Sequence, residues 1–162
     1  MKKLLTAALL LTATTANADL YGGGHYTQLE SDGIKLGGLG ANLGYEHSIN
    51  MKTAVIAEAK FGLGVQDETE YGVNLELDDY RIFSVKAKYI TDTGVYFTGS
   101  LSHATINLTA SYRGYEFSDS GSEAGYGAGI GYDFETLQTD VELTYEKFDD
   151  VNVATINFKF DF

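Results

Sequence analysis

V-A-T-I-N-F-K-F-D-F, residues 153–162, is the stretch of this sequence that decides the fold. Apolar and polar residues alternate strictly along it. The apolar face holds Ala154, Ile156, Phe158, Phe160 and Phe162, and the polar face holds Thr155, Asn157, Lys159 and Asp161. Successive side chains of a β-strand point to opposite sides, so the stretch predicts a strand with one apolar and one polar wall. Such a strand either forms the edge of a soluble β-sandwich or closes a barrel whose outer face meets lipid.

The N-terminus has the features of a secretory signal peptide. Two lysines follow the first methionine, residues 4–11 are almost wholly apolar, and Ala16-Asn17-Ala18 fits a cleavage site of small residues. The apolar segment is too short to span a bilayer as a helix, although an uncleaved N-terminal anchor is the alternative. We therefore expect a signal peptide over residues 1–18 and a single mature domain over residues 19–162.

The composition excludes several classes of protein. The chain of 162 residues contains 19 glycines and 12 tyrosines but no proline, tryptophan or cysteine. Without cysteine there can be no disulfide framework, no lipoprotein anchor and no thiolate metal site. The formal net charge is −12, which argues against nucleic-acid binding because that requires a basic surface. Abundant glycine and tyrosine without proline favour many short strands joined by polar turns.

Seven further segments alternate in a similar way, so we expect eight antiparallel strands in up-and-down order. The expected strands cover residues 20–27, 38–46, 54–65, 83–89, 95–102, 124–134, 140–146 and 153–162. Short turns are expected at 47–50, 91–94, near Thr136 and at 149–150, and longer polar or acidic loops at 30–33, 66–79 and 108–121. An even strand count with short turns and longer loops in alternation is typical of an outer-membrane β-barrel.

The glycines decide which face of this barrel points inward. An eight-stranded barrel could instead hold its apolar face inside, as lipocalins do. The glycines crowd the polar face, however, at Gly38, Gly40 and Gly44 and at every second residue from Gly125 to Gly131. Small residues suit a narrow lumen, whereas on a solvated exterior they would only weaken the strands. We therefore predict an apolar exterior in lipid and a lumen lined by glycines and charges.

Two sets of functional side chains follow from this assignment. The predicted lumen polar network contains His25, Glu58, Lys60, Lys86, Lys88, Glu142 and Lys159. The predicted aromatic girdle, at strand ends beside the short turns and the C-terminus, contains Tyr45, Tyr89, Tyr132, Phe134, Phe160 and Phe162. Aromatic girdles mark the headgroup level of a membrane, so the second set predicts the periplasmic boundary of the barrel.

The sequence resembles the eight-stranded outer-membrane β-barrels of the OmpA-like and OmpX-like group, which includes the opacity-type surface proteins. The resemblance rests on G-G-L-G-A-N-L-G-Y-E (37–46), G-Y-G-A-G-I-G-Y-D-F (125–134), V-E-L-T-Y-E (141–146) and the terminal N-F-K-F-D-F. It implies a monomer in the outer membrane, in contact with lipid and lipopolysaccharide. It also implies that the assembly machinery recognises the C-terminal strand through Phe158, Phe160 and Phe162. Because the sequence ends at Phe162, no peptidoglycan-binding domain is expected.

OmpA-type barrels carry ion pairs in the lumen, and the resemblance implies two such pairs here. Glu58 and Lys86 match one pair of positions. At the second pair of positions, Gly131 stands where an acid is expected and Glu142 stands where a base is expected. Glu142 would therefore need another partner, either Lys159 or His25.

Together these observations favour a non-enzymatic surface protein that contributes to envelope integrity or to contacts with other surfaces. One alternative is a small pore in which the charged lumen residues line the path of ions. Another is a lipid A-modifying hydrolase, for which the adjacent Ser102 and His103 are the only local hint. No catalytic, cofactor or metal site is predicted, since His25, His47 and His103 have no metal-like spacing.

The predicted loops are rich in carboxylates, at residues 67–79 and 116–123. A charged surface of this kind keeps a protein soluble and solvated. Clustered carboxylates also suit Ca²⁺ and Mg²⁺, so divalent cations could link the loops to lipopolysaccharide phosphates.

Overall fold

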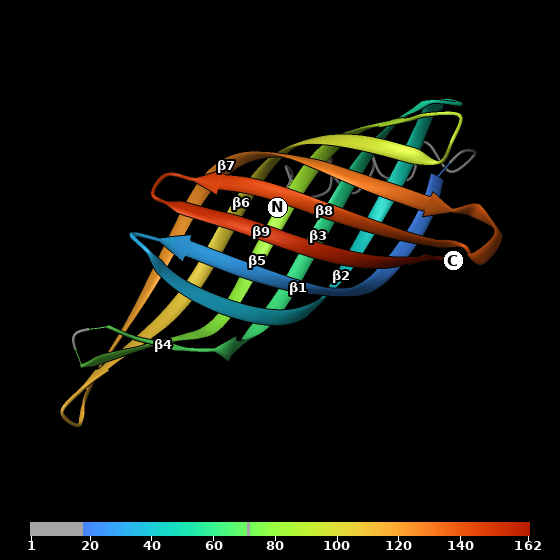
Figure 1. Ribbon diagram of the computed structural model, residues 1–162. Coiled ribbons are helices and arrows are strands. Elements are labelled where there is room, and N and C mark those ends of the chain that lie inside the picture. The colour runs from blue at the N-terminus through green and yellow to red at the C-terminus, as the bar shows by residue number, and fades with distance from the viewer. Residues whose placement is uncertain (1–17, 71) are drawn as a thin grey trace, which may run out of the picture.

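The computed structural model describes residues 18–70 and 72–162, which form strands almost throughout (Figure 1). The elements are β1 (Ala18–Ser31), β2 (Ile34–Asn50), β3 (Thr53–Gln66), β4 (Glu68–Glu70), β5 (Val73–Ile90), β6 (Val95–Tyr112), β7 (Tyr115–Phe134), the 3-10 turn η1 (Glu135–Leu137), β8 (Thr139–Phe148) and β9 (Val151–Asp161). In this part of the chain, no helix is long and apolar enough to cross a membrane. The predicted signal peptide lies outside the described residues, apart from Ala18.

Eight long strands close into an antiparallel ring. Strands adjacent in sequence pair with each other, except that β3 pairs directly with β5 while the short β4 adds to β5 beyond the ring. The ring closes where the first strand meets the last, with Tyr21 opposite Asp161 and Glu30 opposite Asn152. Figure 1 shows this seam as the blue β1 beside the red β9. The prediction of an eight-stranded up-and-down barrel is therefore confirmed.

Burial alternates along the strands, with the polar side chains turned into the lumen. In β9, Asn157 and Lys159 are buried, whereas Phe158 between them is 46% exposed. In β6, Tyr96 is buried and its neighbour Phe97 is 49% exposed. Apolar side chains thus cover the outside of the ring, which suits lipid rather than water. The apolar-out assignment made from the glycines is correct.

The two ends of the barrel differ in shape. Residue 18, the C-terminus and the turns at 51–52, 91–94 and 135–138 lie at one end, and the remaining hairpins extend from the other (Figure 1). Outer-membrane barrels have short turns in the periplasm and longer connections outside. We therefore assign the end with the termini as periplasmic and the opposite end as extracellular.

Two segments predicted as loops are strands. Residues 66–79 contain β4 and the start of β5, and residues 108–121 belong to β6 and β7. The turn predicted at 47–50 is also wrong, because β2 continues to Asn50 and the chain reverses at Met51 and Lys52. A strand segment such as 115–124, which stands clear of the ring, is exposed on both faces. It therefore lacks the apolar alternation by which strands are recognised in a sequence.

These segments extend the wall of the ring outward. Together with the adjoining residues of the wall they are called here the extracellular blade. It consists of β4, residues 73–81 of β5, residues 104–112 of β6 and residues 115–124 of β7. At its tip, Tyr112 pairs with Tyr115 across a two-residue turn. Arg113 and Gly114 have φ angles of 50° and 85°, as in the type I′ turn of tight hairpins.

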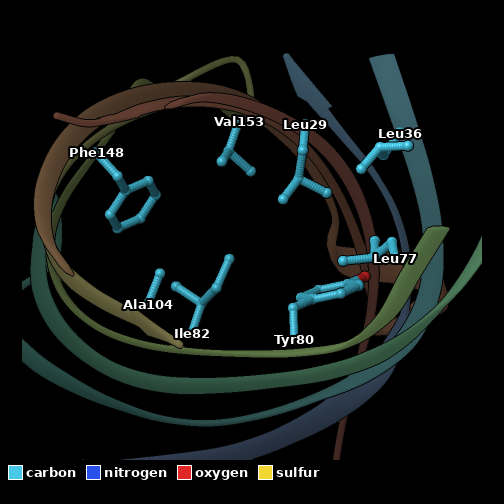
Figure 2. Packing of buried hydrophobic residues seen from close by; sticks show 8 residues of the cluster. All are labelled: Leu29, Leu36, Leu77, Tyr80, Ile82, Ala104, Phe148 and Val153. Carbon is cyan, nitrogen blue, oxygen red and sulfur yellow. The ribbon is translucent and has the colours of Figure 1, made fainter. Parts of the chain in front are cut away.

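The extracellular half of the lumen is apolar, which the sequence analysis did not predict. Figure 2 shows the side chains of this cluster pointing into the ring from several strands. Its buried members are Leu29, Leu36, Leu77, Tyr80, Ile82, Ala104, Phe148 and Val153. Along β5 the cluster ends at Ile82, and the buried Ser84 and Lys86 follow on the same face. The lumen is thus layered, with apolar side chains above a charged centre.

Candidate functional sites in the lumen and the extracellular blade

Lys86 lies at the centre of an ion-pair network in the lumen. Its Nζ is 2.7 Å from Glu58 Oε1 and 3.0 Å from Glu142 Oε2, and all three side chains are fully buried. Glu58 lies on β3 and Glu142 on β8, which is not a neighbour of β3 in the ring. Lys86 on β5 therefore links opposite walls of the barrel, and it forms the Glu58 pair that the resemblance implies.

Lys159, not His25, is the second lysine beside Glu142. Its Nζ lies 2.5 Å from Glu142 Oε2 and 3.9 Å from Glu58 Oε2. The Nε2 atom of His25 lies instead 2.8 Å from the hydroxyl of Tyr80. Of the two alternatives that the sequence left open, the geometry selects Lys159.

Glu146 is a buried acid that the predicted network lacked. Lys60 Nζ lies 3.2 Å from Glu146 Oε2 and 3.6 Å from Glu58 Oε1. Ser100 and Ser102 donate hydrogen bonds to Glu146 Oε1. The alternation of its strand already put Glu146 on the polar face, so the signal was present in the sequence. The central cluster, as we use the term below, consists of Glu58, Lys60, Lys86, Glu142, Glu146 and Lys159.

Lys88 belongs to a separate group nearer the periplasmic end. Its Nζ lies 3.1 Å from Glu46 Oε2 and 3.6 Å from Asp140 Oδ2. It also lies 4.5 Å from the ring centroid of Tyr96, a cation–π contact. The alternation along β5 places Lys88 among the lumen charges but indicates neither of its carboxylate partners.

Glycines make room for aromatic rings in the lumen. The ring of Tyr21 lies over Gly44 and the ring of Tyr96 over Gly131, so that a Cβ at either glycine would overlap the ring. The Tyr21 hydroxyl donates a 2.7 Å hydrogen bond to Glu58 Oε2. Gly131, where the resemblance implied an acid, thus provides the space that Tyr96 occupies.

The central cluster balances three carboxylates against three lysines, and its side chains are at most 3% exposed. A path for ions would have to separate these buried pairs, which is costly. We therefore expect the purified barrel to produce no discrete conductance steps in a planar lipid bilayer. Barrel-free detergent added to the same bilayer is the control. Regular steps of one size would contradict a closed lumen and favour the pore.

All six residues of the predicted aromatic girdle lie toward the periplasmic end. Their side chains are exposed on the outside of the ring, except for Tyr45, which is half-buried. The rings of Tyr132 and Phe134 meet edge to face, with centroids 4.6 Å apart. Phe158 and Phe160 also point outward, and the backbone N–H of Phe162 donates to the carbonyl of Leu20 at 2.9 Å. Recognition of these three phenylalanines by the assembly machinery stays a prediction.

The only local hint of hydrolase chemistry, Ser102 beside His103, is divided between two faces. Ser102 turns into the lumen, where its hydroxyl lies 2.8 Å from that of Ser84, whereas His103 points outward. There its Nε2 lies 3.0 Å from the hydroxyl of Ser122. Within residues 18–70 and 72–162 no carboxylate hydrogen-bonds His103, so this pair lacks the acid of a catalytic triad.

The carboxylates predicted to lie in loops are spread along the extracellular blade. Asp79 accepts a 2.9 Å hydrogen bond from Asn107, and Asp78 accepts one of 2.8 Å from Thr109. Over the described residues, no group of three or more His, Cys, Asp and Glu could hold a metal ion.

The blade exposes aromatic side chains and an open strand edge. Tyr115 and Phe117, near its tip, are each 70% exposed. Residues 115–124 of β7 pair with β6 on one side, and the ladder to β8 begins only at Gly125. On its other side this stretch therefore has no strand partner in the described part of the chain. A free edge of this kind can accept an extended segment of another protein.

Comparisons with known proteins agree with this architecture. Residues 4–162 match the model of the outer membrane protein beta-barrel domain. Ail, the attachment invasion locus protein of Yersinia pestis, is similar with a TM-score of 0.61 at 23% identity, over 90% of this chain and 97% of that chain. Ail in complex with the heparin analogue sucrose octasulfate gives 0.59 at 24% identity, with the same coverage. Neisserial surface protein A gives 0.57 at 12% identity, over 88% and 94%. No curated protein sequence matches significantly.

Proposed function

Since the chain belongs to the outer membrane protein beta-barrel domain family, we propose that it acts as a non-enzymatic surface protein that binds other proteins through its extracellular blade. The barrel itself resides in the outer membrane, where its apolar exterior contacts lipid. The central cluster and the apolar cluster occupy the lumen and brace the strands that carry the blade.

The exposed aromatic side chains of the blade carry the proposal. Tyr115 and Phe117 are 70% exposed at the point farthest from the membrane. Exposed aromatic residues are typical anchors of protein interfaces, because they bury a large area while ordering few bonds. Beside them, the free edge of β7 offers backbone groups for strand addition.

Charge indicates which class of ligand the blade would accept. Its sequence contains Glu68, Glu70, Glu76, Asp78, Asp79, Glu116, Asp119 and Glu123, against only Arg81 and Arg113. Ail has been seen with a sulfated heparin analogue. A blade with this excess of carboxylates should repel such a polyanion, so we propose a protein segment as the partner.

Removal of both exposed aromatics tests the proposal. Bacteria that carry the Tyr115→Ser/Phe117→Ser double variant should attach to cultured epithelial cells about tenfold less than bacteria with the unchanged barrel, because anchors of this kind dominate binding energy. Attachment is measured by counting bound cells at equal surface levels of the protein.

The matched control is Leu137→Ser. It removes a 69% exposed apolar side chain at the periplasmic end, and attachment should be unchanged. Equal attachment by the double variant and by Leu137→Ser would refute the role of the blade. If added heparin reduced the attachment of bacteria with the unchanged barrel as strongly as the double variant does, the blade would instead bind a polyanion.

A further inference from the structure

The extracellular mouth of the lumen contains a cavity that the attachment role does not use. Its volume is about 300 Å³, and Leu29, Leu36, Ile106 and Phe148 are among the side chains that line it. On β5 the buried Ile82 lies between Leu75, which lines the cavity, and the buried Lys86 of the central cluster. Figure 2 shows the side chain of Ile82 pointing into the ring. The cavity therefore lies at the extracellular end of the lumen, on the far side of Ile82 from the central cluster.

The size and lining of this cavity suit an apolar ligand. Ligand sites are concave and mainly apolar, with a few polar groups that orient the ligand, and they start at roughly this volume. An apolar cavity of roughly 150 Å³ already binds benzene and stays free of water. The walls of this one offer water few hydrogen bonds, so an apolar body of one ring and a short chain would be favoured there.

Charge at the rim narrows the choice of ligand. Asp32, Asp119 and Glu123 line the outer part of the cavity and are exposed. Asp32 comes from the β1–β2 turn, and the other two lie on the inward face of β7. Among the residues that line the cavity there is no lysine or arginine. An anionic group would be repelled at this rim, whereas a cation would be attracted.

We propose that the mouth of the barrel binds small organic cations with an apolar body, such as arylalkylammonium ions. The apolar part lies between Leu29, Ile106 and Phe148, and the ammonium group lies at the rim, where the carboxylates of Asp119 and Glu123 make the potential negative. Asp119 and Glu123 also belong to the blade, but the site does not use Tyr115 or Phe117, so it does not rest on the attachment function.

The test uses the full barrel in zwitterionic phospholipid nanodiscs, free of detergent that could fill the cavity. Titration calorimetry with 4-phenylbutylammonium should give saturable binding after subtraction of the heat from empty nanodiscs. The anion 4-phenylbutyrate, which has a comparable apolar body, should bind at least about fivefold more weakly. An Asp119→Asn/Glu123→Gln variant should bind the cation more weakly by the same factor, because exposed ion pairs contribute modestly.

A second pair of variants tests the cavity itself. Ala104→Phe fills the cavity from its wall and should abolish binding, whereas Ala128→Phe makes the same change on the outer face and should leave binding intact. Heat-modifiable migration on gels verifies that each variant folds. If Ala104→Phe fails to fold, Ile106→Trp, at a half-buried residue of the cavity wall, replaces it. Unchanged binding by a folded cavity-filling variant, or equal binding of the anion and the cation, would overturn the proposal.

Discussion

Replacing Lys86 with methionine should lower the free energy of unfolding of the barrel by about 3 kcal/mol, because it leaves a buried carboxylate without compensation. Methionine retains most of the volume of the side chain, so packing changes little. The central cluster would, however, hold three carboxylates against two lysines, out of reach of water. The midpoint of urea unfolding in phospholipid vesicles, followed by gel migration, measures the loss.

Lys52→Met is the matched control for this prediction. Lys52 pairs with Asp92 at 2.8 Å on the periplasmic surface, where both side chains are well exposed. Its removal should leave the unfolding midpoint unchanged, because exposed ion pairs are screened by water. Adding Glu142→Gln to Lys86→Met removes the excess negative charge and should restore part of the stability. Equal midpoints for Lys86→Met and Lys52→Met would show that the lumen tolerates an unpaired carboxylate.

The faces of the strands could be predicted from the sequence because strand geometry enforces them. With a period of two, an apolar Phe158 in lipid requires that Asn157 and Lys159 point into the lumen, and they do. The same alternation predicts Glu58, Lys86 and Glu142 in the lumen, and all three are buried there. Alternation along one strand is a local property, so a single sequence contains it.

The partners of the lumen charges could not be predicted in the same way. Lys88 meets Glu46 and Asp140 because the strands β2, β5 and β8 hold these residues at one level of the ring. That level depends on strand tilt and on the stagger of the whole closed sheet. Glu146 was likewise on the correct face of its strand, yet nothing local indicated that Lys60 would reach it.

The strands of the blade could not be predicted from the sequence, for a different physical reason. The stretch 115–124 reads Y-E-F-S-D-S-G-S-E-A, so its apolar contrast fades after Phe117. Its pairing with β6 continues nonetheless, from Tyr115 opposite Tyr112 to Ala124 opposite His103. Backbone hydrogen bonds and the tight turn at Gly114 hold this hairpin together, and neither requires an apolar face. The loop predicted at residues 108–121 was therefore wrong, because this hairpin continues outside the membrane as paired strands.

Replacing Gly23 with alanine should destabilise the barrel by about 3 kcal/mol, at the upper end of overpacking costs. A Cβ at Gly23 would overlap the backbone carbonyl of Phe158 and lie 2.8 Å from Asn42 Oδ1. The carbonyl cannot move aside as a side chain could, because Gly23 pairs with Lys159 in the ladder that joins β1 to β9. The expected result is a lower urea midpoint and a larger unfolded fraction on detergent gels.

Gly99→Ala distinguishes this clash from the general effect of adding a methyl group to a strand glycine. Gly99 lies on β6, and a Cβ there would meet no atom within 4 Å. Its replacement should be neutral or stabilising by about 0.5 kcal/mol, since alanine restricts the unfolded chain. The seam between β1 and β9 joins the first and the last strand of the ring. Crowding at this seam therefore opposes closure of the ring. If both alanine variants unfolded at the same urea concentration, the close approach at Gly23 would not limit how the ring closes.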